Sequence, residues 1–568
     1  MAVYRSDQAQ LTFGPEAAPG GYPELASDVT DGTGAAVLNM AAGLPAGSTK
    51  MTVDGLSGIT ANEDIQIGPE VAGSGTTAES EVRRVELVEG TTLFLDAPTA
   101  FFHPDNTNIQ VVTAIITTAA DIYMNQIPGV YDTVEVPDMA PTLEPRYFLG
   151  TQSKRDFFAV YKGQQAFTGS VSGFVLLNGR ALRYPFGKVV TTTASVTQRT
   201  TIPVAGAKKG DVYLTVTDAS SISAGTLIGI DCGVTTPPNT GLVVGTGTAR
   251  HYPDVGEVRS VVSKSSNTLR LDYPLSFDHV GDLTTGTAST AQITSIAAGQ
   301  TYDHHIFEQV DLDTVSWHVH MRDSGETAAN DFDRTYFGGM IGSATLAADE
   351  GGMLNMSWDG VNFQGFKHNQ MQGNSSSSSA IVPHAGLMQS ITASNVDFPT
   401  SNPYFFSQGS VTMFGVEVAR VRSFSLGVSN GEEPRYYIQR RQGNKRGPTE
   451  IREQRREYTL GVTLALPDSQ AAAGASGNTI FKEFLTEGDF GSGMQGFNIV
   501  LSFTRGANDS ITITIPDDGT AATGGNEQGA FFRSAPHGIT GDNPVQVDAD
   551  ILVRNAKILV TDSLYYYP

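Results

Sequence analysis

The sequence predicts an all-β-dominated protein that contains two repeated small β-domain insertions. Three observations support this. Apolar and polar residues alternate over long stretches, glycine is frequent (62 of 568 residues), and one residue pattern occurs twice with identical spacing. Because successive side chains of a strand point to opposite faces, alternation favours half-buried strands, and the glycines suit the turns between them.

Length and composition narrow the class of protein. A chain of 568 residues is expected to form several domains. Its net charge of −23 argues against a surface that grips nucleic acid by neutralising phosphates. The single cysteine, Cys232, excludes an intrachain disulfide and is predicted to be a buried thiol. The sequence shows no secretory signal and no apolar run near the ~18 residues of a membrane span.

The first segment, residues 1–30, is predicted to be an extended arm. Its Gly- and Pro-rich stretch, Gly14–Pro23, is unsuited to a regular element. We divide the remainder into two inserted β-domains (residues 31–112 and 197–295) and a host domain in two segments (residues 113–196 and 296–568).

The inserted domains are predicted from an internal repeat. Glu81-Val-Arg83 and Glu257-Val-Arg259 are each followed by a Leu-x-Leu pair, a proline and a histidine. The two histidines, His103 and His279, each stand 22 residues after the corresponding glutamate. Matching strands, spacings and turns predict two copies of one compact β-unit, and two copies are too few for a solenoid.

The strongest strand patterns lie within Val411–Leu466. In Ser423–Val428 the apolar residues alternate with serine and glycine, and Tyr458–Leu466 alternates in the same way. These patterns predict two long strands, each with one apolar face and one small, polar face. The segment between them, Glu432–Glu457, is densely charged.

That charged segment holds the only concentration of basic residues in the chain. Glutamates are mixed with them, so the local net charge is small, and an interface between protein subunits is favoured over a solvated loop or a contact with DNA. The candidate contact residues are Arg435, Arg440, Arg441, Lys445, Arg446, Arg452, Arg455 and Arg456.

Patterns that suggest catalysis or metal binding are weak. Gly427-Val-Ser429-Asn-Gly431 matches the G-x-S-x-G nucleophile elbow, but a turn follows it instead of a helix. The histidines His304, His305, His318 and His320 lack cysteine or acidic ligands at a convincing spacing and are interpreted as a polar or interface face. We therefore predict no catalytic residue, no cofactor and no metal, and a protein that is not an enzyme.

The order of these features resembles the tail tube (major tail) proteins of long-tailed viruses of bacteria and archaea. The resemblance rests on the two long strands around a charged loop, the Phe-x-x-Phe-Leu segment Phe481–Leu485, and the hairpin pattern of Gly338–Asp359. It also takes in Phe167–Gly187 and the strand Val545–Val553, and covers about two thirds of the chain.

The resemblance implies a host domain folded as a tail-tube-like β-sandwich or partial barrel with a flanking short helix. It also implies a virion structural protein that is assembled in the host cytoplasm. Six copies would form a ring in which the inner sheets join into one barrel, and the arm would contact neighbouring subunits. The rings would stack around a tape measure protein, meet tail terminator and distal tail proteins at the tube ends, and conduct genome DNA. The repeated units would decorate the outside, where they could contact the host surface. The alternative is a distal tail or adhesin-type protein that binds host surface glycans.

A wall past which DNA slides must not bind phosphate, so small polar and acidic side chains are expected to line the bore. The candidates are Glu417, on the polar face of the predicted strand Val411–Val421, and Asp548 and Asp550, on Val545–Val553.

Overall fold

The fold is described from a computed structural model. It describes residues 4–21, 29–61, 63–68, 81–115, 126–138, 140–147, 157, 159–193, 196–203, 205–232, 255–279, 292–309, 311–323, 332–368, 401–413, 416–417, 421–438, 446–465, 497–515, 530–534, 537–538 and 546–567. The prediction of an all-β-dominated protein is confirmed, because strands account for nearly all the regular structure of these residues. None of the described helices is long and apolar enough to cross a membrane.

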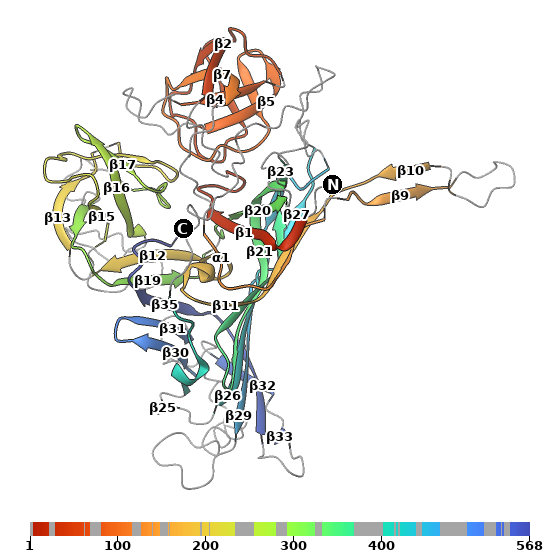
Figure 1. Cartoon of the computed structure of the whole chain (residues 1–568), viewed down its shortest axis with the longest axis vertical. Coiled ribbons are helices and arrows are strands. Elements are labelled where there is room, and N and C mark those ends of the chain that lie inside the picture. Colours follow the sequence, from red (N-terminus) through yellow and green to blue (C-terminus); the bar gives the residue numbers. More distant parts are fainter. Residues whose placement is uncertain are drawn as a thin grey trace, which may run out of the picture.

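The largest element is a twelve-stranded sheet, seen nearly edge-on in Figure 1. Its main path runs through β32 (Ala530–Ser534), β34 (Gln546–Val553), β29 (Glu457–Ala465), β26 (Val421–Ser429), β21 (Phe332–Asp349), β22 (Asn355–Phe363), β11 (Phe167–Val175) and β8 (Thr133–Glu135). Four further strands join it off this path: β1 (Tyr4–Pro15), β20 (Val315–Asp323), β23 (Gly365–His368) and β33 (His537–Gly538).

The two long strands predicted around the charged segment are neighbours in this sheet. β26 and β29 pair antiparallel, with Leu426 opposite Leu460 and Ser425 opposite Gly461. Their leucines are fully buried, whereas Ser425 is exposed. The prediction of one apolar and one small, polar face is therefore confirmed for both strands.

The prediction of an extended arm is wrong for Tyr4–Pro15. This segment is β1, which pairs antiparallel with β20, and Leu11 and Phe13 are buried in the main core. The glycines and prolines that suggested an arm begin only at Gly14, after most of the strand. His318 and His320 of β20 are buried, so they do not form a solvated face.

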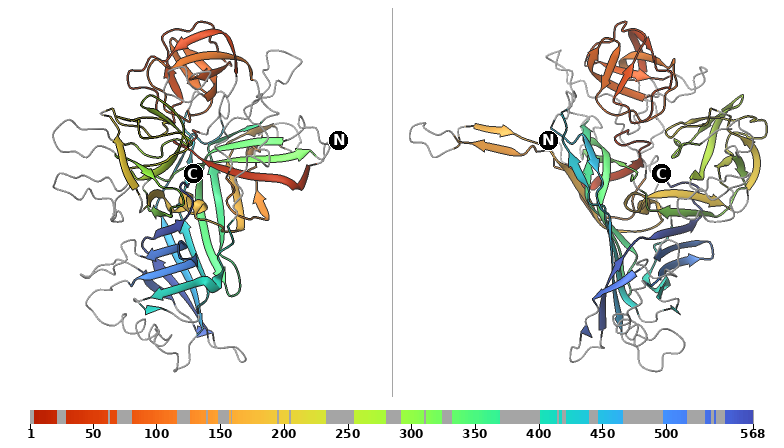
Figure 2. Two further views of the ribbon diagram at one scale, coloured as in Figure 1. Left: turned by 60° about the vertical axis from the view of Figure 1, so that its left-hand side comes forward. Right: turned by 180° about the vertical axis from the view of Figure 1, so that it is seen from behind.

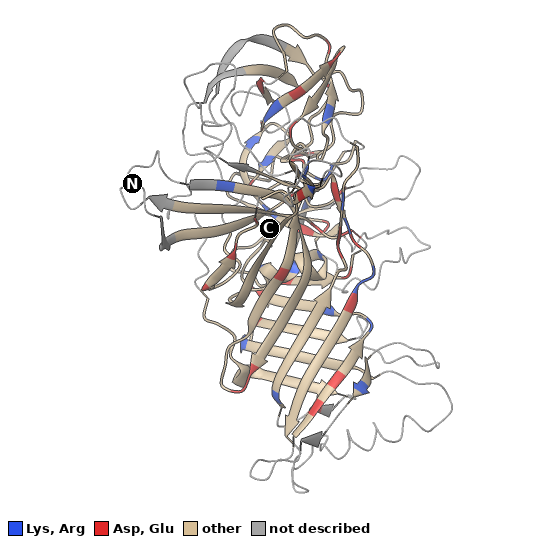
Figure 3. Cartoon of the chain, turned by 90° about the vertical axis from the view of Figure 1, so that its right-hand side faces the viewer, with Lys and Arg blue, Asp and Glu red and all other residues tan. Residues whose placement is uncertain are grey.

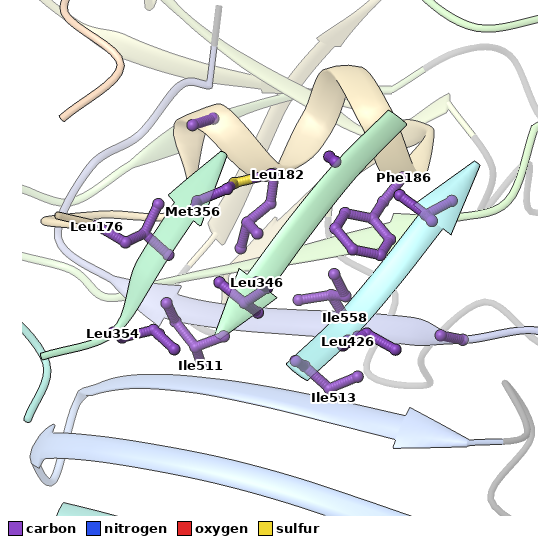
Figure 4. Packing of buried hydrophobic residues seen from close by; sticks show 14 of the residues in the cluster. Leu176, Leu182, Phe186, Leu346, Leu354, Met356, Leu426, Ile511, Ile513 and Ile558 are labelled. Carbon is purple, nitrogen blue, oxygen red and sulfur yellow. The ribbon is translucent and has the colours of Figure 1, made fainter. Parts of the chain in front are cut away.

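A second, seven-stranded sheet packs on the apolar face of the large sheet. Its order is β12 (Lys188–Thr193), β19 (Tyr302–Phe307), β35 (Lys557–Asp562), β31 (Asp509–Ile515), β30 (Ile499–Gly506), β24 (Gly409–Met413) and β25 (Val416–Glu417). Figure 4 shows side chains of both sheets, such as Leu346 and Ile511, meeting in one core.

The described helices are short. They are η1 (Arg180–Leu182), α1 (Arg183–Phe186) and η4 (Phe406–Gln408). Leu182 and Phe186 are buried in the core between the sheets (Figure 4). The flanking helix predicted near Phe481–Leu485 lies outside the described residues.

The repeated units form two six-stranded sheets with the same strand order. In the first the order is β2 (Val29–Val37), β7 (Asn108–Ile115), β4 (Asp64–Ile67), β5 (Glu81–Glu89), β6 (Thr92–Leu95) and β3 (Lys50–Thr52). In the second it is β13 (Val196–Thr201), β18 (Gln292–Ile296), β15 (Leu227–Ile230), β16 (Glu257–Ser265), β17 (Thr268–Leu271) and β14 (Tyr213–Thr215). Each sheet encloses its own apolar core.

The residues that revealed the repeat form a buried ion cluster in each unit. In the first unit the Glu81 carboxylate lies 2.7 Å from the Arg83 guanidinium and 2.6 Å from His103 Nε2. The backbone N–H of Ala100 also donates to this carboxylate. Burial opposes ionisation of Glu81, but the guanidinium and these hydrogen bonds outweigh burial and lower its pKa.

The second unit repeats the cluster and adds a partner. Glu257 contacts Arg259 and lies 2.7 Å from His279 Nε2, while Asp231 lies 2.9 Å from His279 Nδ1. Burial alone would lower the pKa of His279, but the two carboxylates raise it to about 9. The Arg259 guanidinium also lies 3.9 Å from the ring centroid of Tyr566, which connects this cluster to the end of the host domain.

At each insertion, the chain enters and leaves the repeated unit at neighbouring positions, because the residues on the two sides are strand partners. Val29 and Ile115 are partners at the ends of the first unit. At the second, Thr193 of β12 is opposite Tyr302 of β19, so the host strands that flank the insertion are already neighbours. The six strands of each unit lie within three residues of the predicted bounds. Cys232, at the host-facing side of the second unit, is a free buried thiol as predicted.

Candidate functional site

The outer face of the large sheet is the surface on which a function can be built. The residues of β21, β22, β26, β29 and β34 that point away from the core stand opposite one another across the strands, as in the row Asp359–Ser343–Ser429–Glu457. We call this set the polar face: Ser343, Thr345, Ala347, Asp349, Asn355, Ser357, Asp359, Ser423, Ser425, Gly427, Ser429, Glu457, Thr459, Gly461, Thr463, Ala465, Gln546, Asp548, Asp550 and Leu552.

The charges on the polar face have one sign. Five of its members are acidic, and none of those just named is Lys or Arg. Figure 3 looks straight at this face and shows mostly uncharged ribbon with scattered acidic positions. Two described cations approach its acids from outside the set: Arg533 of the edge strand β32 lies 3.7 Å from Asp550, and Arg455, just before β29, lies 3.7 Å from Glu457. Small side chains leave the face flat, and the acids make it repel phosphate.

The structure places two of the predicted residues, Asp548 and Asp550, on the polar face. Asp548 stands opposite Thr463, whose hydroxyl donates to it at 2.9 Å, and Asp550 stands opposite Gly461. Sequence reasoning missed the other three acids, Asp349, Asp359 and Glu457. Their positions on the polar side of alternating strands would have identified them, because the same period-2 rule applies.

Glu417 does not belong to the polar face. It is exposed on β25, at the edge of the seven-stranded sheet, where it pairs with Thr412 of β24. The prediction grouped Val411–Val421 with the long strand that follows it. The chain instead changes sheets between β25 and β26, and alternation within a strand cannot show which sheet the strand joins.

The large sheet ends in strands whose outer edges are largely without a described partner. Among the strands that the structure places, β32 pairs only with β34, and β8 only with β11; Ala530 of β32 also forms an isolated bridge with Phe497. An open edge presents unpaired backbone N–H and C=O groups, which favour pairing with another strand. The two edges lie on opposite sides of one continuous sheet, so edge-to-edge contact between copies would extend the polar face.

The charged segment forms a small ribbon at the end of this sheet. Its strands β27 (Glu433–Arg435) and β28 (Glu450–Arg452) pair antiparallel. Arg435 contacts Glu433 at 2.7 Å, and Arg452 contacts Glu450 at 2.5 Å, with all four side chains at least partly exposed. These are exposed ion pairs within single strands, which contribute little to stability and can exchange partners.

The remaining predicted contact residues differ in their surroundings. Arg455 and Arg446 are exposed. Arg456 is not available for a contact, because its side chain is only 9% exposed and its guanidinium donates to Asn430 Oδ1 at 2.8 Å and to the Phe186 carbonyl. Arg440, Arg441 and Lys445 lie outside the described residues.

The residues of the G-x-S-x-G pattern, which could have suggested an enzyme, end a strand and hold the backbone of neighbouring segments. Ser429 ends strand β26 on the polar face, and the side-chain amide of Asn430 donates to the carbonyls of Ile341 and Pro185. Across the described ranges, no group of three or more His, Cys, Asp or Glu side chains is placed to hold a metal ion.

Comparison of the sequence with protein-family models finds no match, and a search of curated proteins also finds none.

Proposed function

We propose that this chain is a tail tube subunit whose polar face lines the bore of a tube through which genome DNA passes. The observation that carries the proposal is the polar face itself: five acids and no base among twenty outward residues on five adjacent strands. A protein that binds nucleic acid needs Lys and Arg at such a surface, whereas a conduit needs their absence.

The open edges support a ring in which copies extend one another's sheets. Pairing of β32 of one copy with β8 of the next would remove both edges and close a barrel, with the polar faces inside and the apolar cores outside. Six copies per ring, a tape measure protein in the bore, and terminator and distal tail proteins at the tube ends belong to the same proposal.

The repeated units have space on the outside of such a tube. Figure 2 shows both units on the side or end of the molecule away from the large sheet, and neither covers the polar face in Figure 3. A bore of fixed width has no room for two extra domains, so this placement agrees with an exterior role. Contact with the host surface is part of this proposal.

Electron microscopy of the purified protein tests the proposal directly. Long, hollow tubes are expected, and a reconstruction should place Asp548 and Asp550 within reach of the axis. Isolated rings or trimers would favour a distal tail or adhesin-type protein instead. Tubes with Lys and Arg around the bore and the polar face outside would overturn the assignment of the wall.

Removal of the second repeated unit should leave assembly intact. Since Thr193 and Tyr302 are partners in the host sheet, a short Gly/Ser turn can replace residues 194–301 without moving β12 or β19. We expect tubes of unchanged bore and smaller outer diameter. A folded deletion variant that forms no polymer would show instead that the unit belongs to the assembly contact.

A further inference from the structure

The residue pattern that marks the repeat builds the same turn on both units. After the Leu-x-Leu pair come Asp96-Ala-Pro98 in the first unit and Asp272-Tyr-Pro274 in the second. Each aspartate accepts a hydrogen bond from the backbone of the neighbouring strand, at 3.0 Å from the N–H of Arg84 and of Ser260. The Asp-x-Pro turn is therefore held in the same way in the two units.

A buried arginine lies beneath each turn. Arg83 donates to the Pro98 carbonyl at 3.0 Å, and Arg259 donates to the Pro274 carbonyl at 2.8 Å. Both guanidinium groups also bind the glutamate of their own cluster. These bonds use N–H groups in the plane of the guanidinium, so an aromatic ring can stack on its flat face without displacing them. We call the arginine and its Asp-x-Pro turn the socket of each unit.

In the second unit the aromatic ring comes from outside the unit. Tyr566, which follows β35 of the host domain, has its ring centroid 3.9 Å from Arg259 Cζ and 4.8 Å from the ring centroid of Tyr273. The preceding residue, Tyr565, donates its hydroxyl to Asp272 at 2.5 Å. Two successive tyrosines of the host domain thus occupy the socket.

The next tyrosine holds the same segment on the host domain. Tyr567 stacks on His304 with ring centroids 3.8 Å apart, its hydroxyl donates to Asp562, and its carbonyl accepts from the Arg183 guanidinium at 2.7 Å. We call Tyr565–Tyr567 the strap, because it contacts the host domain at one end and the second unit at the other. Figures 1 and 2 show this end of the chain between the second unit and the host sheets.

The first unit is attached through the same turn, but by different host residues. Ala97 packs against Phe337 of β21, and a Cβ added to Gly20 would lie 2.9 Å from a Pro98 side-chain carbon, so the backbone after β1 passes close to this turn. Phe337 is itself fixed by strand pairing, opposite Gly365 of β23. The pattern shared by the two units therefore coincides with their attachment to the host domain.

We propose that the repeated pattern is an attachment signature, and that the strap sets the orientation of the second unit by occupying its socket. The unit encloses its own apolar core, so it should stay folded when the strap is withdrawn. It would then turn about the point where it joins β12, where the Thr191 N–H donates to the Gly256 carbonyl at 2.9 Å. The inference concerns one chain and does not rest on the tube proposal.

Spin labels on the full chain measure the orientation of the second unit. Val262→Cys on β16 and Thr504→Cys on β30 place the two labels at exposed positions, and native Cys232 is buried. Dilution with unlabelled chains restricts the signal to distances within one chain. The native strap should give one narrow distance. Tyr566→Leu combined with Tyr565→Phe should lose it and give a broad distribution, because the ring over Arg259 and the bond to Asp272 are both absent.

Two matched variants test whether the aromatic ring is what the socket binds. Tyr566→Phe keeps a ring over Arg259 and should keep the narrow distance. Lys209→Gln removes another contact between the second unit and the host domain, the ion pair of Lys209 with Asp313 at 3.2 Å, and should also keep it. A distribution as broad in Tyr566→Phe as in the double tyrosine variant would overturn the socket, and broadening by Lys209→Gln alone would overturn the role of the strap.

Hydrogen exchange separates loss of orientation from loss of the fold. In the double tyrosine variant, peptides covering the Asp272–Ser276 turn should lose protection, while those from β15 and the start of β17 stay protected. Loss of protection throughout residues 197–295 would show that Tyr566 belongs to the folding core of the unit, which would contradict the proposal. A narrow distance and a protected turn in that variant would contradict it as well.

Discussion

In the proposed tube, arginine on the polar face is expected to convert a wall that does not bind DNA into one that retains it. Ser425→Arg with Thr459→Arg places two cations on adjacent central strands, next to Gly461 and Gly427, where there is room for long side chains. Six copies would put twelve cations into each ring. Because every neutralised phosphate releases counterions, the variant tubes should bind DNA strongly at low salt and release it as salt rises.

The salt dependence is the quantity to measure. A site with about six to ten phosphate contacts loses on the order of 10³–10⁵ in affinity between roughly 50 and 200 mM salt. Pelleting tubes with labelled DNA across this range gives the slope. Ser425→Gln with Thr459→Gln controls for side-chain size and should bind no DNA. Arginine tubes that assemble normally and ignore DNA at low salt would show that these positions do not face the bore.

Loss of the carboxylate at the centre of a repeated unit should unfold that unit. Glu257→Gln leaves Arg259 and His279 buried with one acidic partner fewer. Breaking a buried ion pair on one side costs about 3–5 kcal/mol, which approaches the whole stability of a small domain. Hydrogen exchange of peptides from residues 197–295 should rise sharply, while the host sheets remain protected. Val262→Ala, an exposed change on the same strand, should have no such effect.

The same cluster predicts how stability of the second unit depends on pH. The pKa of Glu257 is lowered in the folded chain, so its stabilisation is present above about 4.5 and is lost as pH falls through the lowered value. The pKa of His279 is raised from 6.5 to about 9, so its stabilisation is complete below 6.5 and is lost as pH rises through 9. Protection from hydrogen exchange, taken relative to the intrinsic exchange rate at each pH, should therefore be greatest between about pH 4.5 and 6.5. In Glu257→Gln the loss at high pH should begin earlier.

Local patterns carried most of what could be predicted from the sequence. The alternation in Ser423–Val428 and Tyr458–Leu466 predicts both the strands and the side on which their polar residues lie. The repeat could be detected because Glu81 and His103 recur as Glu257 and His279 at the same spacing. The spacing is kept because each glutamate contacts its histidine inside a buried ion cluster. Asp548 and Asp550 followed from the same period-2 rule.

What could not be predicted depends on pairing between distant segments. β1 is a strand because β20 is available to pair with it, some 300 residues away in sequence, and nothing near Leu11 indicates that partner. Glu417 was placed in the wrong sheet for a related reason, since pairing decides which sheet a strand joins. The ribbon formed by β9 (Leu143–Arg146) and β10 (Ala159–Lys162) was missed because its exposed aromatic side chains resemble core residues in sequence.

The division of the host domain into two segments also affects the order in which parts of the chain can fold during synthesis. Each repeated unit is built from one continuous stretch, so its strands can pair as soon as that stretch leaves the ribosome. The large sheet must wait, because β21 pairs with β26, and β29 with β34, from segments made much later. Contacts of such long sequence separation form slowly. We therefore expect nascent chains to carry two finished repeated units while the large sheet is still incomplete. In the proposed tube, this would delay polymerisation until synthesis is nearly complete.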